Sequence, residues 1–98
     1  MFALVCARRR PELVFADQFV DDLDEVWSPR GYDQVRRALS MIEQFPESGL
    51  RSLPRSIERE FGHTVRKCAA GPFDIVYDYD VDVDTVYVLG LVAQRSAE

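Results

Sequence analysis

The feature that most constrains the fold is a pair of apolar runs near the end of the chain, separated by a short acidic segment. In the first run, residues 73–80, aromatic and aliphatic side chains alternate with aspartates and a valine, and this period of two is typical of a strand. The second run, residues 85–93, is rich in Val and Leu, as expected for a strand covered on both faces. The acidic residues 80–84 join the two runs. The pattern predicts an antiparallel hairpin that another layer must cover.

The period of two residues also extends upstream of this hairpin. Residues 63–68 alternate and reach the first run through Gly71-Pro72, so three consecutive strands are expected to form an antiparallel meander. Residues 56–61, with the sequence SIEREF, alternate as well. Extended structure is therefore expected from shortly after Gly49.

Two amphipathic helices are predicted before the sheet. Ser28-Pro29 joins a side chain that caps helices to a residue that suits the first helical position, and it opens a helix over residues 29–45. The apolar stripe of this helix recurs at steps of three and four residues: Tyr32, Val35, Leu39 and Ile42. An earlier stripe consists of Phe19, Val20, Leu23, Val26 and Trp27. The tight link between the stripes predicts an antiparallel helical hairpin.

The start of the first helix has two interpretations. In the preferred one, Leu13–Phe15 is a strand and Asp17 caps the helix. In the other, Pro11 is the first helical residue and Phe2–Ala7 is the first strand. Both lead to an α+β fold in which an N-terminal strand and a helical hairpin pack on a small antiparallel β-sheet. We expect one domain over residues 1–98, with residues 1–10 as an extra strand or arm.

Composition narrows the class of protein. The 98 residues are 47% hydrophobic and 30% charged, as in an ordinary globular domain, and no apolar run is long enough for a membrane span. Two cysteines fit no metal-ligand spacing and suggest a reducing, cytoplasmic setting. The formal net charge of −5 is not typical of a nucleic-acid-binding protein. Any contact with a polyanion is expected to use residues 51–67, which carry a local net charge of +3.

The last third of the chain also resembles a known family. Residues 66–80 read R-K-x-x-x-G-P-F-x-I-V-Y-x-Y-D, and residues 86–95 read V-Y-V-L-x-x-V-x-Q-R. Together with the helical hairpin and the Phe45-Pro46 exit from it, this pattern resembles the RelE/ParE superfamily of bacterial toxins over about residues 13–95.

The resemblance implies a function. Such proteins are the toxin components of type II toxin–antitoxin modules, which inhibit growth in the bacterial cytoplasm until a cognate antitoxin neutralises them. Ribosome-dependent members cleave mRNA, whereas ParE members inhibit DNA gyrase and lack the nuclease residues. The resemblance therefore implies an antitoxin partner, either the ribosome with mRNA or gyrase as a target, and no cofactor. The oligomeric state is open.

The resemblance also points to four candidate catalytic residues. Arg66 and Arg95 match cationic positions of the mRNA-cleaving members, and Lys67 or His63 would assist them. Transition-state stabilisation in these members requires cations directed at a phosphate. Asp74 stands where they usually carry an Arg, and it would repel the phosphate instead.

Each candidate also has a structural interpretation. Arg66 and Lys67 would neutralise Asp74 across the strand pair. His63 would lie on the surface or in a turn, and Arg95 would be a solvated chain end. Two tyrosines near these candidates, Tyr77 and Tyr79, are expected to pack in the core. Whether the protein is an enzyme is therefore left open, and the alternative function is a non-toxic, catalytically degenerate RelE-fold module that binds other proteins.

Overall fold

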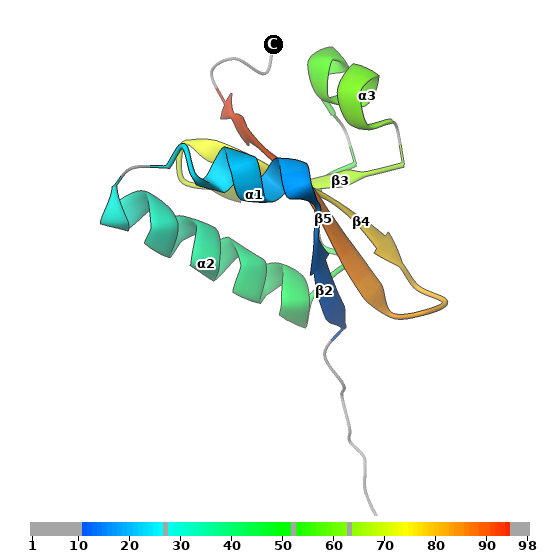
Figure 1. Ribbon diagram of the computed structural model, residues 1–98. Coiled ribbons are helices and arrows are strands. Elements are labelled where there is room, and N and C mark those ends of the chain that lie inside the picture. Colours follow the sequence, from blue (N-terminus) through cyan, green and yellow to red (C-terminus); the bar gives the residue numbers. More distant parts are fainter. Residues whose placement is uncertain (1–10, 27, 52, 63, 95–98) are drawn as a thin grey trace, which may run out of the picture.

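The computed structural model describes residues 11–26, 28–51, 53–62 and 64–94. In chain order, their elements are β2 (Glu12–Phe15), α1 (Asp17–Leu23), α2 (Pro29–Gln44), α3 (Arg55–Phe61), β3 (Arg66–Ala70), β4 (Phe73–Asp80) and β5 (Thr85–Ala93). Figure 1 shows α1 and α2 as a helical hairpin beside the sheet and α3 on its other side. None of the helices in the described ranges is long and apolar enough to cross a membrane.

The sheet has the strand order β2-β5-β4-β3. Strands β3, β4 and β5 form the predicted antiparallel meander, and β2 pairs in parallel with β5. The preferred N-terminal strand is confirmed, and a helix beginning at Pro11 is wrong, because the backbone of β2 pairs with β5 from Glu12 onward. The expectation for residues 1–10 concerns residues outside the described ranges.

The helix pair follows the sequence pattern with two corrections. Ser28 caps α2 as predicted, since the backbone N–H of Gly31 donates to its Oγ at 3.0 Å. Asp17 does not cap α1, because Ala16 occupies the capping position and Asp17 is the first helical residue. Helix α1 also ends at Leu23, before the end of the predicted stripe, because the chain turns there and the N–H of Val26 bonds back to the Leu23 carbonyl.

The prediction of extended structure over residues 56–61 is wrong, because this segment is helix α3. Ile57 and Phe61 are four residues apart, so they share a helical face as readily as they alternate along a strand. Pro54 precedes the helix in an extended conformation, and Gly62 ends it with a φ of +93°, a value that favours glycine. The following strand begins at Arg66, three residues later than the alternation in residues 63–68 suggested.

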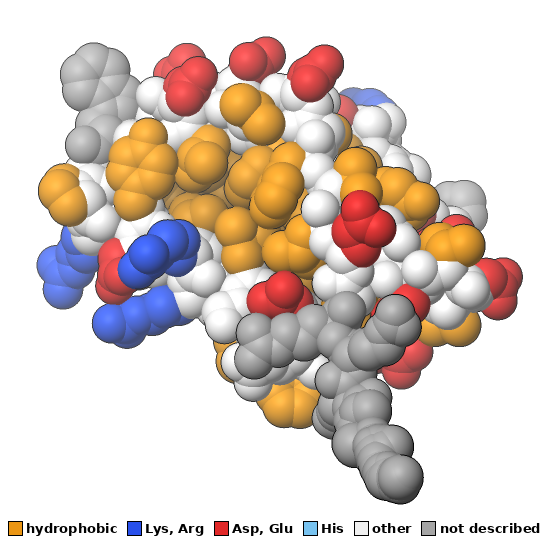
Figure 2. Space-filling model, turned by 60° about the horizontal axis from the view of Figure 1, so that its bottom comes forward, with side chains coloured by type: hydrophobic (Ala, Val, Ile, Leu, Met, Phe, Trp, Pro, Cys, Tyr) orange, Lys and Arg blue, Asp and Glu red, His pale blue; other side chains and the backbone are white. Residues whose placement is uncertain are grey.

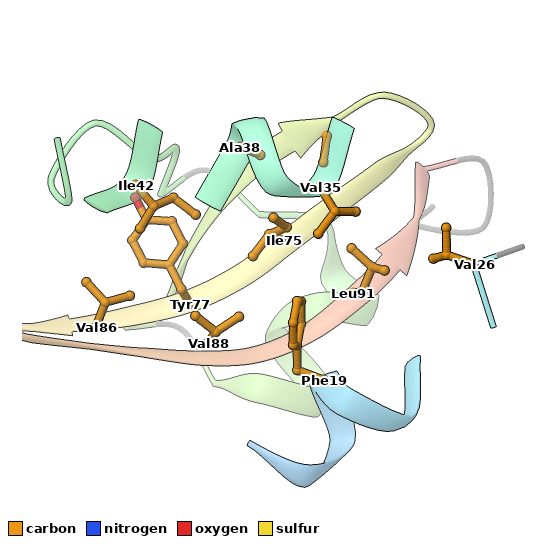
Figure 3. Close-up of a cluster of buried hydrophobic side chains, with 11 residues drawn as sticks. Phe19, Val26, Val35, Ala38, Ile42, Ile75, Tyr77, Val86, Val88 and Leu91 are labelled. Carbon is orange, nitrogen blue, oxygen red and sulfur yellow. The ribbon is translucent and has the colours of Figure 1, made fainter. Parts of the chain in front are cut away.

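Two hydrophobic clusters hold the layers together, one on each face of the sheet. The larger one lies under α1 and α2, and Figure 3 shows Ile42 of α2 and Phe19 of α1 directed toward β4 and β5. The smaller one joins Ile57 of α3 to Val65 and Val76. Tyr77 belongs to the first cluster and Val76 to the second, because neighbouring strand residues point to opposite faces. From Val88 onward, β5 contributes to both clusters, as predicted for a doubly covered strand.

Candidate functional site

The two described candidate cations, Arg66 and Lys67, are neighbours in β3 and lie on opposite faces of the sheet. Arg66 pairs with Tyr77 of β4, whose side chain is in the cluster under α2. Lys67 pairs with Val76, whose side chain is in the cluster under α3. Because side chains alternate along a strand, the two cations cannot converge on one group from these positions.

Arg66 is engaged with the loop that follows α2. Its Nη1 donates to the carbonyl of Glu47 at 2.7 Å and lies 3.4 Å from the carbonyl of Gly49. The Tyr77 hydroxyl holds the same loop, because it donates to the Pro46 carbonyl and accepts from the Gly49 N–H, both at 2.9 Å. Burial raises the pKa of this phenol. The guanidinium and the phenol therefore fasten the loop to the sheet, and both tyrosines expected in the core pack there, Tyr79 at its edge.

On the opposite face, Lys67 forms an ion pair with Asp74. Its Nζ lies 3.3 Å from Asp74 Oδ2, and the Lys67 side chain is only 20% exposed. The Nε2 of Gln94 donates to the other carboxylate oxygen at 3.1 Å. Asp74 itself is 3% exposed and is the one buried charged residue among those described. The structural interpretation of Lys67 is thus confirmed by its contact, whereas Arg66 takes no part in neutralising Asp74.

The other two candidate residues, His63 and Arg95, lie outside the described residues. Gln94 was missed by sequence reasoning, because its contact with Asp74 joins residues that are 20 positions apart. No group of three or more potential metal ligands occurs in the described ranges. Burial, followed by the nearby Asp74 charge, raises the pKa of the Cys68 thiol, which therefore stays protonated and a poor nucleophile at neutral pH.

A second candidate site is an apolar surface between α1 and α2, which we call the apolar face. Leu13 of β2, Leu23 of α1 and Leu39 of α2 belong to it and are partly buried against the larger cluster. The exposed Phe15, Val20 and Tyr32 share the sides of these elements, because they lie two, three and seven residues away along a strand or helix. These three are large side chains with substantial exposure, namely Phe15 at 44%, Val20 at 46% and Tyr32 at 41%. Figure 2 shows hydrophobic side chains gathered into one hollowed area, with acidic side chains along one edge and cationic ones along another.

The two helices that flank the apolar face expose charged side chains. Helix α1 and the turn after it expose Asp17, Asp21 and Asp24. Helix α2 exposes Arg36 and Arg37, which share Asp33 in ion pairs of 3.6 and 3.2 Å. Exposed pairs of this kind are weak, so both guanidinium groups stay available to a partner. The apolar face is thus bordered by opposite charges, which suits an amphipathic segment bound in one orientation.

No protein-family model matches the chain, and no curated protein matches it significantly. Solved structures do. The toxin–antitoxin complex RelBE2 from Mycobacterium tuberculosis contains a chain that matches with a TM-score of 0.68 at 19% identity, over 87% of this chain and 99% of that one. The RelE–RelB complex from Pyrococcus horikoshii gives 0.64 at 13% identity, over 88% and 97%.

A further match is the intact RelBE toxin–antitoxin complex from Escherichia coli, with a TM-score of 0.63 at 15% identity, over 85% of this chain and 95% of that one. Structural matches at sequence identities this low establish the fold alone. The chain therefore has the RelE fold, and the predicted α+β, RelE/ParE-like architecture is confirmed.

Proposed function

We propose that this chain is the toxin component of a type II toxin–antitoxin module, acting in the bacterial cytoplasm and neutralised by a cognate antitoxin. The observation that carries the proposal is the likeness to RelE chains solved in complex with RelB, which spans 85% or more of this chain and 95% or more of each of those. The exposed apolar face supports it, because a surface of this kind is characteristic of a chain that spends time bound to a partner.

The antitoxin would cover the apolar face with an amphipathic helix or strand. Apolar residues of that segment would contact Val20 and Tyr32, and its charged residues would meet the two edges of the surface. Cationic residues would face the aspartates of α1, and acidic residues would face Arg36 and Arg37. Folding of the segment on this surface would bury apolar area that is otherwise in water.

The toxin would act in one of two modes, ribosome-dependent mRNA cleavage or ParE-like inhibition of gyrase. In the first, Arg66 and Arg95 would hold the scissile phosphate, and Lys67 or His63 would assist. In the second, the protein would act by binding its target. The Lys67–Asp74 ion pair and the attachment of Arg66 to the loop carbonyls favour the second mode, since both cations already have partners.

The same observations keep one alternative in view, a non-toxic RelE-fold module that binds proteins. Induced expression in a bacterial host separates it from a toxin. We expect growth arrest, and an Ile75→Asp variant is the control, because a charge in the core should abolish the fold and the arrest together. Normal growth at verified soluble expression of the unchanged chain would reject the toxin proposal in favour of the binding module.

Neutralisation can be tested in the same host. Genomic fragments from the source organism that restore growth would be selected during induction. Rescue by such a fragment should be lost for a Val20→Glu/Tyr32→Glu variant that still arrests growth. An Arg55→Ala/Arg59→Ala variant on exposed positions of α3 is the matched control and should still be rescued. Rescue that is indifferent to the changes at Val20 and Tyr32 would place the antitoxin elsewhere.

A further inference from the structure

We propose that Asp74 is an internal anion that occupies Lys67 and Gln94, so that this face of the sheet does not bind the phosphate groups of RNA. The inference rests on the proposed toxin function and chooses between its two modes, because a toxin with this arrangement would act by binding a target. It concerns the face of the sheet under α3, and it is carried by the geometry of three side chains from neighbouring strands.

The carboxylate has one donor for each of its oxygens. Lys67 in β3 lies diagonally across from Asp74 in β4, and its Nζ reaches Oδ2 at 3.3 Å. Gln94 follows β5, and its Nε2 reaches Oδ1 at 3.1 Å and the carbonyl of Phe73 at 3.3 Å. The backbone N–H of Gln94 also donates to the Pro72 carbonyl at 2.9 Å. The carboxylate thus holds two donors of the kind that a bound phosphate would need.

Because Asp74 is buried, replacing its contact with Lys67 by a contact between Lys67 and a phosphate is unfavourable. Asp74 is 3% exposed, so its charge has little access to water and depends on Lys67. A phosphate that drew Lys67 away would leave a buried carboxylate without its counter-charge, which is strongly unfavourable. The phosphate would also lie near that carboxylate and would be repelled by it. Lys67 is the only lysine of the chain, and it is therefore committed to an internal partner.

Arg66 cannot take over the role of Lys67. Its side chain is on the other face of the sheet, where its Nη1 donates to the Glu47 carbonyl at 2.7 Å. Exposed arginines on α3, Arg55 and Arg59, can attract RNA without specific geometry, so the test has to separate their contribution from that of Lys67. The separation is possible because the two sets of cations can be changed independently.

The test measures binding of a single-stranded RNA oligonucleotide to the purified full chain by fluorescence anisotropy at low salt. Asp74→Asn keeps the shape of the side chain and removes its charge, so it should tighten binding about tenfold, as expected for one released charged contact. Lys67→Gln should leave the affinity of the unchanged chain as it is. In the Asp74→Asn background, Lys67→Gln should remove the gain. Arg55→Ala/Arg59→Ala should weaken all four forms by a similar factor.

Two results would overturn the proposal. One is a loss of RNA affinity on Lys67→Gln that is as large in the unchanged chain as in the Asp74→Asn background, which would show that Lys67 is already available to phosphate. The other is an Asp74→Asn variant that folds, by circular dichroism, and gains no affinity. If Asp74→Asn does not fold, Asp74→Ser takes its place as the uncharged variant, alone and with Lys67→Gln, because its side chain is smaller and keeps a hydroxyl for Gln94.

The cellular version keeps this inference separate from the proposed function. We expect arrest by the unchanged chain with intact mRNA, and the same arrest by Lys67→Gln. If the unchanged chain arrests growth and depletes mRNA, and Lys67→Gln no longer depletes mRNA, the inference is overturned and the toxin function stands. An absence of arrest would reject the toxin function, while the RNA-binding measurements would still decide whether Asp74 occupies Lys67.

Discussion

The two faces of the sheet differ in what fills them. The face under α1 and α2 is covered by a broad apolar cluster with contributions from every element except α3, and its tyrosine hydroxyls reach outward to the edge of the cluster. The face under α3 has a small cluster centred on Ile57, Val65 and Val76, together with the buried ion pair of Lys67 and Asp74. One face is therefore a core, and the other combines a minor core with a charged contact.

The difference shows how one strand can serve two purposes. In β4, Ile75 and Tyr77 support the α2 face, while Asp74 and Val76 belong to the α3 face. Packing determines which residues are acceptable on the first side, and electrostatics constrains the second. Changes on the α2 face should therefore act mainly on stability. Changes at Lys67 and Asp74 should act on stability and on binding together.

The sharpest test of the comparison is a matched pair of truncations. Ile42 on the α2 face is 0% exposed and Ile57 on the α3 face is 1% exposed, so both lose the same atoms from a similar burial in Ile→Ala variants. Ile42→Ala should lower the free energy of unfolding by about 4 kcal/mol and Ile57→Ala by about 2 kcal/mol, because the smaller cluster can relax into the space. Urea denaturation measures both values. Equal losses would mean that the α3 face is as much a core as the other.

Removing either partner of the Lys67–Asp74 ion pair should destabilise the protein, and the loss of Lys67 should cost more than the loss of Asp74. Lys67→Ala should lower the free energy of unfolding by about 3 kcal/mol, because it leaves the buried Asp74 carboxylate without its counter-charge. Asp74→Ala should have a smaller effect, about 1–2 kcal/mol, since Lys67 is partly exposed and its ammonium can turn to water. The double variant should lose less than the sum of the two. An additive double variant would show that the pair contributes nothing beyond packing.

The contrast between the faces also explains what sequence could predict. Apolar residues recur with a helical period in α2, at Val35, Leu39 and Ile42, and with a period of two in β4. These periods predicted the helices and the meander. Residues 56–61 failed because a six-residue segment with apolar side chains at Ile57 and Phe61 fits both periods. In the fold, the helix lets Ile57 pack against Val65 and Val76, a tertiary contact that the local pattern does not show.

The candidate site was less predictable than the fold for a similar reason. The sequence shows that Arg66 and Lys67 are consecutive cations, and alternation along a strand places them on opposite faces. Which of the two shares the face of Asp74 depends on the pairing register of β3 and β4. Pairing of Arg66 with Tyr77 fixes that register. The contact of Gln94 with Asp74 joins residues that are 20 positions apart, and no local pattern marks such a contact.

On the α2 face, the Tyr77 hydroxyl anchors the loop that follows α2. Tyr77→Phe removes a hydroxyl that donates to the Pro46 carbonyl and accepts from the Gly49 N–H, and it should lower the free energy of unfolding by about 1–2 kcal/mol. The loop after α2 should also open more often in the variant. Hydrogen–deuterium exchange of its amide protons should therefore accelerate, relative to the unchanged chain, more than exchange in β4 does. A variant with lower stability but unchanged exchange at Gly49 would mean that Arg66 alone holds the loop.

The smallest effect is expected at Tyr79, where the α2-face cluster ends at the β4–β5 turn. Its hydroxyl donates to Asp84 Oδ1 at 2.7 Å, and this hydrogen bond to a carboxylate, followed by burial, raises the pKa of Tyr79 to about 12. The folded state therefore holds the phenolic proton more tightly than the unfolded state, whose tyrosines titrate near pH 10. The stabilisation from this contact should be complete below about pH 10 and should disappear as the pH rises toward 12.

Ultraviolet titration of tyrosinate formation checks the value, and Tyr79→Phe identifies the signal. Asp84→Asn should return the pKa of Tyr79 toward 10, since the charge that opposes ionisation is gone. Asn also tolerates the positive φ of 49° at this position, so the turn should keep its shape. If the titration of Tyr79 does not change in Asp84→Asn, burial in the α2-face cluster would be the cause of the shift. The cluster would then extend further along β4 than the hydrogen bond suggests.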